Sequence, residues 1–194
     1  MIMCTIAFLI LATAELRPEE SGQVLYSASH SLGETLVRVE ELRKADPAAE
    51  SDVTRYQIAV TNFMQHGPYV TAELEGEHVT KSWATDLDHD GSLEVVIWTS
   101  STGSGAYGDL LFYEVVDSRL QRYVLPDSKL LEEHGFAGHD GFEISGDRIL
   151  RSFPVYGPAD ANCCPSGGEA TATYRLVANR LELERVASKP AGHK

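Results

Sequence analysis

The stretch that decides the fold is LEVVIWTSSTGSGAYGDLLFYEVV, residues 93–116 of the 194-residue chain. It contains two runs, 93–99 and 110–116, that are rich in the β-branched and aromatic side chains typical of buried strands. Between them, residues 100–108 are small apart from one tyrosine. The sequence therefore predicts two strands that support one exposed loop.

The composition of this loop suits contact with a partner molecule. Its glycines are Gly103, Gly105 and Gly108. Glycine lets the backbone turn at low steric cost. Ser104 adds a hydroxyl that both donates and accepts, and Tyr107 adds contact area with few torsions to freeze. We predict a recognition loop with Ser104 and Tyr107 as contact residues and the three glycines as the residues that shape it.

Two other interpretations of the loop fit the sequence less well. Residues 103–108 match G-x-G-x-x-G, but a dinucleotide site needs a helix next, and residues 109–116 indicate a strand. A nucleophile turn G-x-S-x-G would need glycine where Thr102 stands. A triad of Ser104, His139 and an aspartate is the remaining enzymatic alternative. We predict that the protein is not an enzyme.

Apolar and polar side chains alternate in several other segments, a period typical of half-buried strands. The apolar members are Val37 and Val39; Tyr56, Ile58 and Val60; Val70, Ala72 and Leu74; and Ala170, Ala172, Tyr174 and Leu176. Turn-forming residues separate the strands at 67–68, 75–76, 117–118 and 145–147. One short helix is predicted, with Ser128 as its N-cap and Gly135 as its stop. The sequence thus predicts an all-β, antiparallel protein with one short helix.

Length and charge limit the classes of partner. A chain of 194 residues, 43% of them hydrophobic, suffices for one domain with a single core. Its 29 acidic and 16 basic side chains give a net charge of -13. This charge argues against nucleic acid and against a membrane surface, since both carry anionic phosphates. A cationic partner fits better.

The N-terminus predicts export. Residues 1–14 carry no charged side chain, residues 6–12 form an apolar run too short to span a bilayer, and residues 12–14 have the small-x-small form of a cleavage site. We predict a signal peptide at 1–14, followed by a single domain at 15–194 with loosely held ends. Loss of the signal would remove Cys4. Cys163 and Cys164 would stay, as a bonded ring, as a pair across a dimer or as free thiols.

An acidic stretch, DLDHDGSLE at residues 86–94, has the spacing of a calcium loop. Its carboxylates are Asp86, Asp88, Asp90 and Glu94. Hard cations prefer such oxygen clusters. The stretch resembles the loops of integrin-type β repeats more than those of EF-hands, because Ile97 stands where an EF-hand has its bidentate glutamate. The alternative is an Asp-Gly turn whose carboxylates accept backbone amide protons. Calcium is the one cofactor that the sequence suggests, and none is required.

The export signal, the acidic β-rich body and the sequence Ser104-Gly105-Ala106-Tyr107 together resemble the periplasmic inhibitors of invertebrate-type lysozyme from Gram-negative bacteria. The resemblance extends over essentially the whole chain after the signal. In that family, a Ser-Gly-x-x-Tyr-like loop enters the active-site cleft of lysozyme. Here one residue, Ala106, separates the glycine from the tyrosine.

The resemblance implies a β-sandwich-like fold, a homodimer, a periplasmic location and inhibition of a host lysozyme by residues 100–108. Invertebrate-type lysozyme would be the preferred target. An alternative of a different class is an exported β-domain that depends on calcium and binds glycans or surface proteins. Residues 86–94 would organise that domain.

Overall fold

The computed structural model describes residues 23–43, 53–62, 65–126, 128–178 and 180–191. Within them, strands that follow one another in sequence pair antiparallel and form three four-stranded sheets. The first sheet contains β1 (Gln23–Leu32), β2 (Thr35–Arg43), β3 (Val53–Asn62) and β4 (Gln65–Glu75). The second contains β5 (Glu77–Thr85), β6 (Glu94–Ser101), β7 (Gly108–Val116) and β8 (Arg119–Tyr123). The third contains β9 (Gly141–Ser145), β10 (Arg148–Pro154), β11 (Glu169–Val177) and β12 (Arg180–Lys189).

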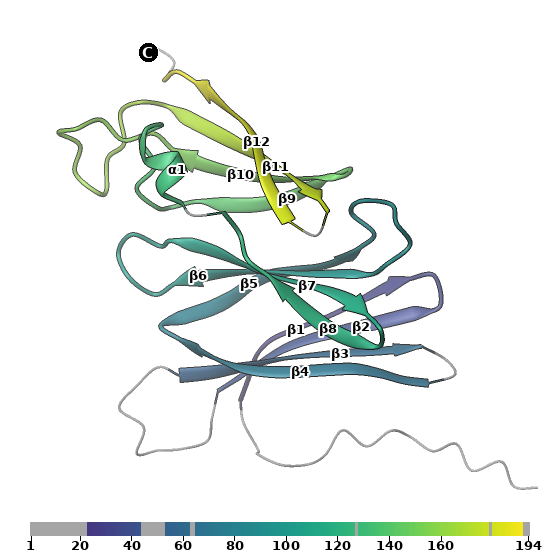
Figure 1. The fold of residues 1–194 in the computed structure, drawn as a ribbon. Coiled ribbons are helices and arrows are strands. Elements are labelled where there is room, and N and C mark those ends of the chain that lie inside the picture. The colour runs from purple at the N-terminus through teal and green to yellow at the C-terminus, as the bar shows by residue number, and fades with distance from the viewer. Residues whose placement is uncertain (1–22, 44–52, 63–64, 127, 179, 192–194) are drawn as a thin grey trace, which may run out of the picture.

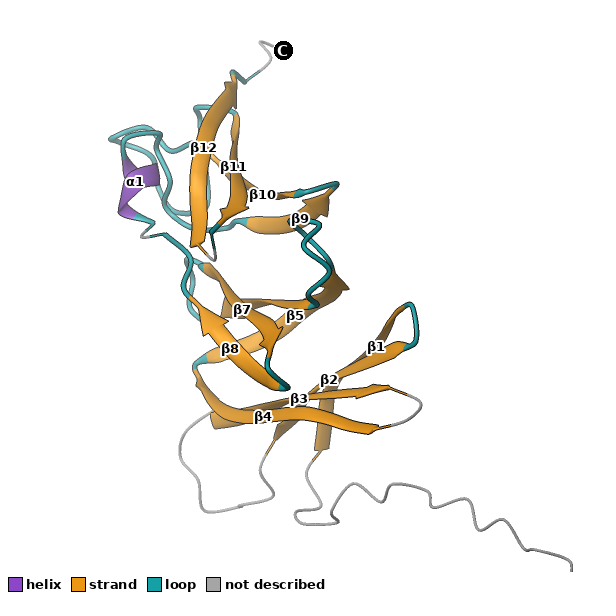
Figure 2. Ribbon diagram, turned by 45° about the vertical axis from the view of Figure 1, so that its right-hand side comes forward, coloured by secondary structure: helices purple, strands orange, loops and turns teal. Residues whose placement is uncertain are grey.

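The three sheets are stacked as layers in chain order, with the second sheet in the middle (Figures 1 and 2). The short helix α1 (Lys129–Glu132) lies in the connection between the second and third sheets. The prediction of an all-β, antiparallel, sandwich-like fold with one short helix is confirmed.

The second sheet is buried on both faces. In β6, Val95 and Ile97 belong to a hydrophobic cluster shared with the first sheet, while Val96 belongs to a cluster shared with the third. In β7, Tyr113 belongs to the cluster shared with the first sheet, and Phe112 belongs to the cluster shared with the third. Successive side chains of a strand point to opposite faces. Two buried faces therefore explain why residues 93–99 are nearly all apolar rather than alternating.

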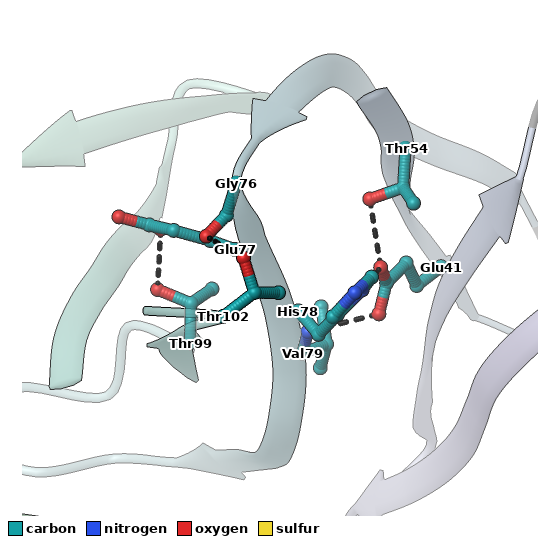
Figure 3. A network of polar contacts seen from close by, with 8 residues as sticks. All are labelled: Glu41, Thr54, Gly76, Glu77, His78, Val79, Thr99 and Thr102. Atoms are coloured by element: carbon teal, nitrogen blue, oxygen red, sulfur yellow. Dashed lines mark hydrogen bonds and ion pairs between the residues drawn. The ribbon is translucent and has the colours of Figure 1, made fainter. Parts of the chain in front are cut away.

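A buried carboxylate connects the first and second sheets. Glu41 of β2 is only 1% exposed. Its carboxylate accepts hydrogen bonds from the Thr54 hydroxyl at 2.7 Å and from the backbone N–H of Val79 at 2.8 Å, and His78 Nδ1 lies 2.7 Å from Oε1. Figure 3 shows these contacts beside the turn between β4 and β5. Polar groups thus satisfy both carboxylate oxygens, as a buried charge requires.

The turn predicted at residues 67–68 is wrong, because both residues lie inside β4. The register with β3 shifts between Ala59 and Thr61. A Cβ on Gly67 would lie 2.4 Å from the carbonyl oxygen of Val60, so glycine permits this close approach. Proline is tolerated at position 68 because β4 is an edge strand of its sheet.

The helix is shorter than its sequence signals predict. Ser128 has helical dihedrals, and its side chain makes no capping hydrogen bond. Leu131 is fully buried, and Gly135 has a φ of +77°, a conformation in which helices commonly end. This single helical turn is therefore held by the packing of Leu131 rather than by a side-chain cap at Ser128.

Several predictions concern the ends of the chain. The predicted signal peptide, Cys4, residues 15–22 and residues 192–194 all lie outside the described residues. Within the described part, no helix is both long enough and apolar enough to cross a membrane.

Candidate functional site

Residues 102–107 connect β6 to β7 and form a hydrogen-bonded turn. The predicted loop, 100–108, also includes the last two residues of β6 and the first of β7. The Ser101 N–H donates to the Tyr107 carbonyl at 2.9 Å, and the Tyr107 N–H donates to the Ser101 hydroxyl, also at 2.9 Å. Inside the turn, the Ala106 N–H donates to the Gly103 carbonyl at 3.0 Å. These bonds fix the loop in one compact conformation.

The glycines shape the loop for a reason other than the predicted one. Ala106 has a positive φ of 41°, whereas Gly103, Gly105 and Gly108 all lie outside the left-handed region. A Cβ on Gly105 would lie 2.4 Å from the Tyr107 ring, and one on Gly108 would lie 2.9 Å from Phe142. Around Gly103 the space is open. Close packing, not backbone freedom, therefore requires glycine at 105 and 108.

The loop rests on segments that flank the strands of the third sheet. The Gly105 carbonyl accepts a hydrogen bond from the His139 N–H at 2.8 Å, and the Ser104 carbonyl accepts one from Asn162 Nδ2 at 2.8 Å. The Tyr107 ring meets Phe136 edge to face, with centroids 5.8 Å apart. Contacts from residues 136–139 and from Asn162 thus brace the loop.

On the opposite side, the loop is attached to the corner between β4 and β5. Thr102 donates from its N–H to the Gly76 carbonyl at 2.9 Å, and its hydroxyl lies 3.3 Å from the same oxygen (Figure 3). Next to it, the Thr99 hydroxyl donates to Glu77 at 2.8 Å. The start of the loop is therefore also held by hydrogen bonds, through Thr102.

A buried ion pair lies beneath the loop. Asp140 accepts hydrogen bonds from the Gly108 N–H at 2.9 Å and from Arg151 Nε at 2.6 Å. Arg151 also donates from Nη2 to the Gly108 carbonyl at 3.2 Å. The Arg151 and Asp140 side chains are 2% and 0% exposed. The guanidinium carbon lies 4.4 Å and 5.1 Å from the ring centroids of Phe136 and Phe142.

Two hydroxyls remain available on the outer side of the loop. Ser104 is exposed and Tyr107 is 50% exposed. Within the described part of the chain, neither side-chain hydroxyl has a hydrogen-bond partner. His139 and Tyr156 stack beside them with ring centroids 6.4 Å apart. The two predicted contact residues thus face solvent on a braced support.

The geometry gives no support to the triad alternative. Across the described ranges, no hydrogen bond joins the Ser104 and His139 side chains, although a serine nucleophile needs such a contact with its base. The neighbouring Asp140 is fully engaged with Gly108 and Arg151.

The acidic stretch lies at the other end of β6, between β5 and β6. The Gly91 N–H donates to Asp86 at 3.2 Å, and the Ser92 N–H donates to Asp90 at 2.7 Å. The Leu87 N–H donates to the carboxylate of Glu94. These contacts are those of an Asp-Gly turn in which carboxylates accept backbone N–H groups. They provide hydrogen-bond partners for only some of the carboxylate oxygens.

The carboxylates of this stretch lie close enough together that they could hold a cation. Asp86, Asp88 and Glu94 place one oxygen each within 4.8 Å of one another, and Asp90, Glu94 and Glu114 do the same. Oδ1 of Asp86 and Oε1 of Glu94 are buried without a hydrogen-bond partner. Buried polar atoms are normally satisfied, and a hard divalent cation would satisfy these two. Glu94 is common to both groups, but Asp90 is grouped with Glu94 and Glu114 rather than with Asp86 and Asp88.

Glu114 is a member of this cluster that the sequence reasoning missed. It lies directly opposite Glu94 in the register of β6 and β7. In the sequence, Glu94 and Glu114 lie at equal distances from the centre of the β6–β7 hairpin, and this symmetry could have predicted that they face each other. The Tyr123 hydroxyl donates to Glu114 at 2.5 Å, and burial together with this carboxylate raises the pKa of Tyr123.

Burial also raises the pKa of Glu94 to about 7, and the nearby charges of Asp88, Asp86 and Glu114 act in the same direction. The hydrogen bond from the Leu87 N–H opposes the rise. Below about pH 7 the protonated form of Glu94 is therefore favoured in the metal-free protein.

Comparison with protein-family models, with curated proteins and with solved structures finds no significant match to this chain.

We predict that the stability of the metal-free protein decreases as pH rises. The pKa of Glu94 is about 7 in the folded protein and 4.5 ordinarily, so between these values the folded state holds the extra proton. The free energy of unfolding should fall across this window by on the order of 3 kcal/mol. Urea unfolding in EDTA at about pH 5 and about pH 8 measures the difference. Glu94→Gln should remove most of it, and an unchanged pH dependence in that variant would contradict the assignment.

A second prediction concerns the buried ion pair. Asp140→Asn keeps the shape of the side chain but leaves the Arg151 charge buried without its counter-ion, which should cost about 3 to 5 kcal/mol of stability. Asp147→Asn is the matched control, since Asp147 pairs with Arg148 at 2.6 Å on the surface. We expect little change in the control because water screens exposed pairs. Equal unfolding midpoints for the two variants would show that the buried pair is not special.

Proposed function

We propose that this protein is an inhibitor of lysozyme that inserts residues 100–108 into the active-site cleft of the enzyme. The observation that carries the proposal is the pair of unpartnered hydroxyls, Ser104 and Tyr107, on a loop braced from two sides. The resemblance of the Ser104-Gly105-Ala106-Tyr107 sequence to the inhibitor family supports an invertebrate-type lysozyme as the target. A periplasmic location and a homodimer are further expectations of that resemblance.

The chemistry of a glycosidase cleft fits two hydroxyls. Such a cleft has a pair of carboxyl groups, of which one is protonated and the other ionised. A hydroxyl can accept from the first and donate to the second. Ser104 and Tyr107 would then occupy the positions of substrate hydroxyls while offering no glycosidic bond to cleave.

Rigidity and charge support the same proposal. Because hydrogen bonds from Asn162, His139 and Ser101 already fix the loop, binding would require little further ordering of the backbone. A net charge of -13 favours a basic partner, as many lysozymes are, and accelerates its association at low salt.

We expect Ser104→Ala and Tyr107→Ala to weaken inhibition by about 1 to 3 kcal/mol each, that is by roughly five- to 150-fold in the inhibition constant. The measurement is a titration of invertebrate-type, chicken-type and goose-type lysozymes with purified protein. Tyr69→Ala is the matched control, because Tyr69 is a similarly exposed tyrosine, at 52%, on β4 of the first sheet. Failure of the unaltered protein to inhibit any class would disprove the function, and an equal loss in the control would move the site.

A calcium-dependent binding domain is the second candidate function. Buried, unpartnered oxygens of Asp86 and Glu94 within a cluster of carboxylates favour it. Asp86, Asp88, Asp90 and Glu94 would hold the ion, and Glu114 lies within reach. Bound calcium would offset part of the negative charge of the cluster and stiffen the β5–β6 connection. The partner would be a glycan or a surface protein.

For this candidate we expect calcium to raise the unfolding temperature, with a stabilisation of about 2.7 kcal/mol at a hundredfold excess over Kd. The effect should be larger at about pH 8 than at about pH 5, because calcium binds the ionised carboxylates. Asp88→Asn should weaken it, whereas Asp117→Asn, in the β7–β8 turn, should not. If millimolar calcium and EDTA leave the unfolding temperature unchanged, residues 86–94 are a turn without a metal.

A further inference from the structure

The connection between β10 and β11, residues 155–168, carries the two adjacent cysteines. Cys163 and Cys164 are free thiols, and both are exposed. A hydrogen bond between the two side chains raises the pKa of Cys164. In this structure the two cysteines are not bonded to each other, and both residues are exposed to solvent.

The same connection holds the recognition loop through Asn162, the residue just before the cysteines. Asn162 Nδ2 donates to the Ser104 carbonyl at 2.8 Å, and the Asn162 carbonyl accepts from the Tyr156 hydroxyl at 2.9 Å. The Cys164 N–H donates to the Ala161 carbonyl at 2.8 Å. This bond closes a four-residue turn with Asn162 and Cys163 at its centre. The backbone at the cysteines thus determines where the Asn162 side chain lies.

We propose that Cys163 and Cys164 are a dithiol modification site, which a small disulfide oxidant closes to a ring, and that ring closure withdraws Asn162 from Ser104. The covalent step requires only the two thiols and the oxidant. Its consequence for a lysozyme partner rests on the proposed function.

The step is a pair of thiol–disulfide exchanges. The thiolate of one cysteine attacks an oxidant R–S–S–R, which gives a mixed disulfide and releases one R–SH. The thiolate of the second cysteine then attacks the protein sulfur, forms the Cys163–Cys164 bond and releases the second R–SH. The protein loses two S–H hydrogens and two electrons, and the oxidant gains both.

Ring closure must change the local backbone. Neighbouring Cα atoms are about 3.8 Å apart across a trans peptide, whereas ordinary disulfides join Cα atoms about 4.4 to 6.8 Å apart. The backbone at 163–164 therefore has to distort, and the Cys164–Ala161 hydrogen bond that fixes the turn is the nearest contact to be lost. Disulfides under such strain are readily reduced, so the change is reversible.

The test compares the full-length protein before and after treatment with glutathione disulfide, and again after reduction. Intact mass should show the loss of two hydrogens per chain. Hydrogen exchange of the peptide covering residues 102–107 should become about fivefold faster on oxidation, the factor expected for one neutral hydrogen bond, and should return on reduction.

Two variants control the experiment. The double variant Cys163→Ser, Cys164→Ser should keep slow exchange under both conditions. Asn162→Ala should exchange faster in both states, with no further effect of the oxidant. A stable glutathione adduct, cross-linked dimers or a closed ring with unchanged exchange at 102–107 would each overturn the proposal.

No lysozyme enters these measurements, so their outcome is independent of the proposed function. An inhibition assay on the two redox forms is a separate readout. If the ring forms and exchange at 102–107 accelerates while no lysozyme is inhibited in either form, the modification site stands and the proposed target fails.

Discussion

The buried ion pair between Arg151 and Asp140 is the contact on which the arrangement of the second and third sheets depends. Desolvating two charges is costly, and the structure offsets the cost with the backbone groups of Gly108 and the rings of Phe136 and Phe142. Gly108 begins β7. The pair therefore does more than join two layers, because it fixes the point at which the candidate recognition loop ends.

The second sheet has a different polar feature at each end of the same hairpin. At one end, neutral hydroxyls face solvent from residues 102–107. At the other end, carboxylates from 86–94 gather with Glu114. Between them, β6 and β7 are largely apolar on both faces, and the Tyr113 hydroxyl of β7 is hydrogen-bonded to the Tyr56 hydroxyl of the first sheet. The two candidate sites thus lie at opposite ends of one hairpin.

Local patterns in the sequence predicted β2, β3, β4, β6, β7 and β11, since alternation and apolar runs depend only on neighbouring residues. No such pattern was predicted for β1 or β5. The turn at 67–68 was wrong because a bulge opposite Gly67 is a property of the paired strand, not of the glycine. The supporting roles of Asp140, Arg151 and Asn162 were not predicted, for a related reason. Each is distant in sequence from the loop it supports, and their spacing matches no known motif. Glu114 was missed because only strand register brings it to Glu94.

The chain-order stacking of the sheets has a consequence for how the protein becomes functional. Each sheet pairs strands that are consecutive in sequence, so its contacts are local and can form as soon as that part of the chain is available. Residues 102–107, by contrast, depend on His139, Arg151 and Asn162, which a ribosome adds later. During synthesis, the hairpin would exist before the supports that give its tip a defined shape. The defined shape of residues 102–107 thus depends on a part of the chain, up to Asn162, that is added after the hairpin itself.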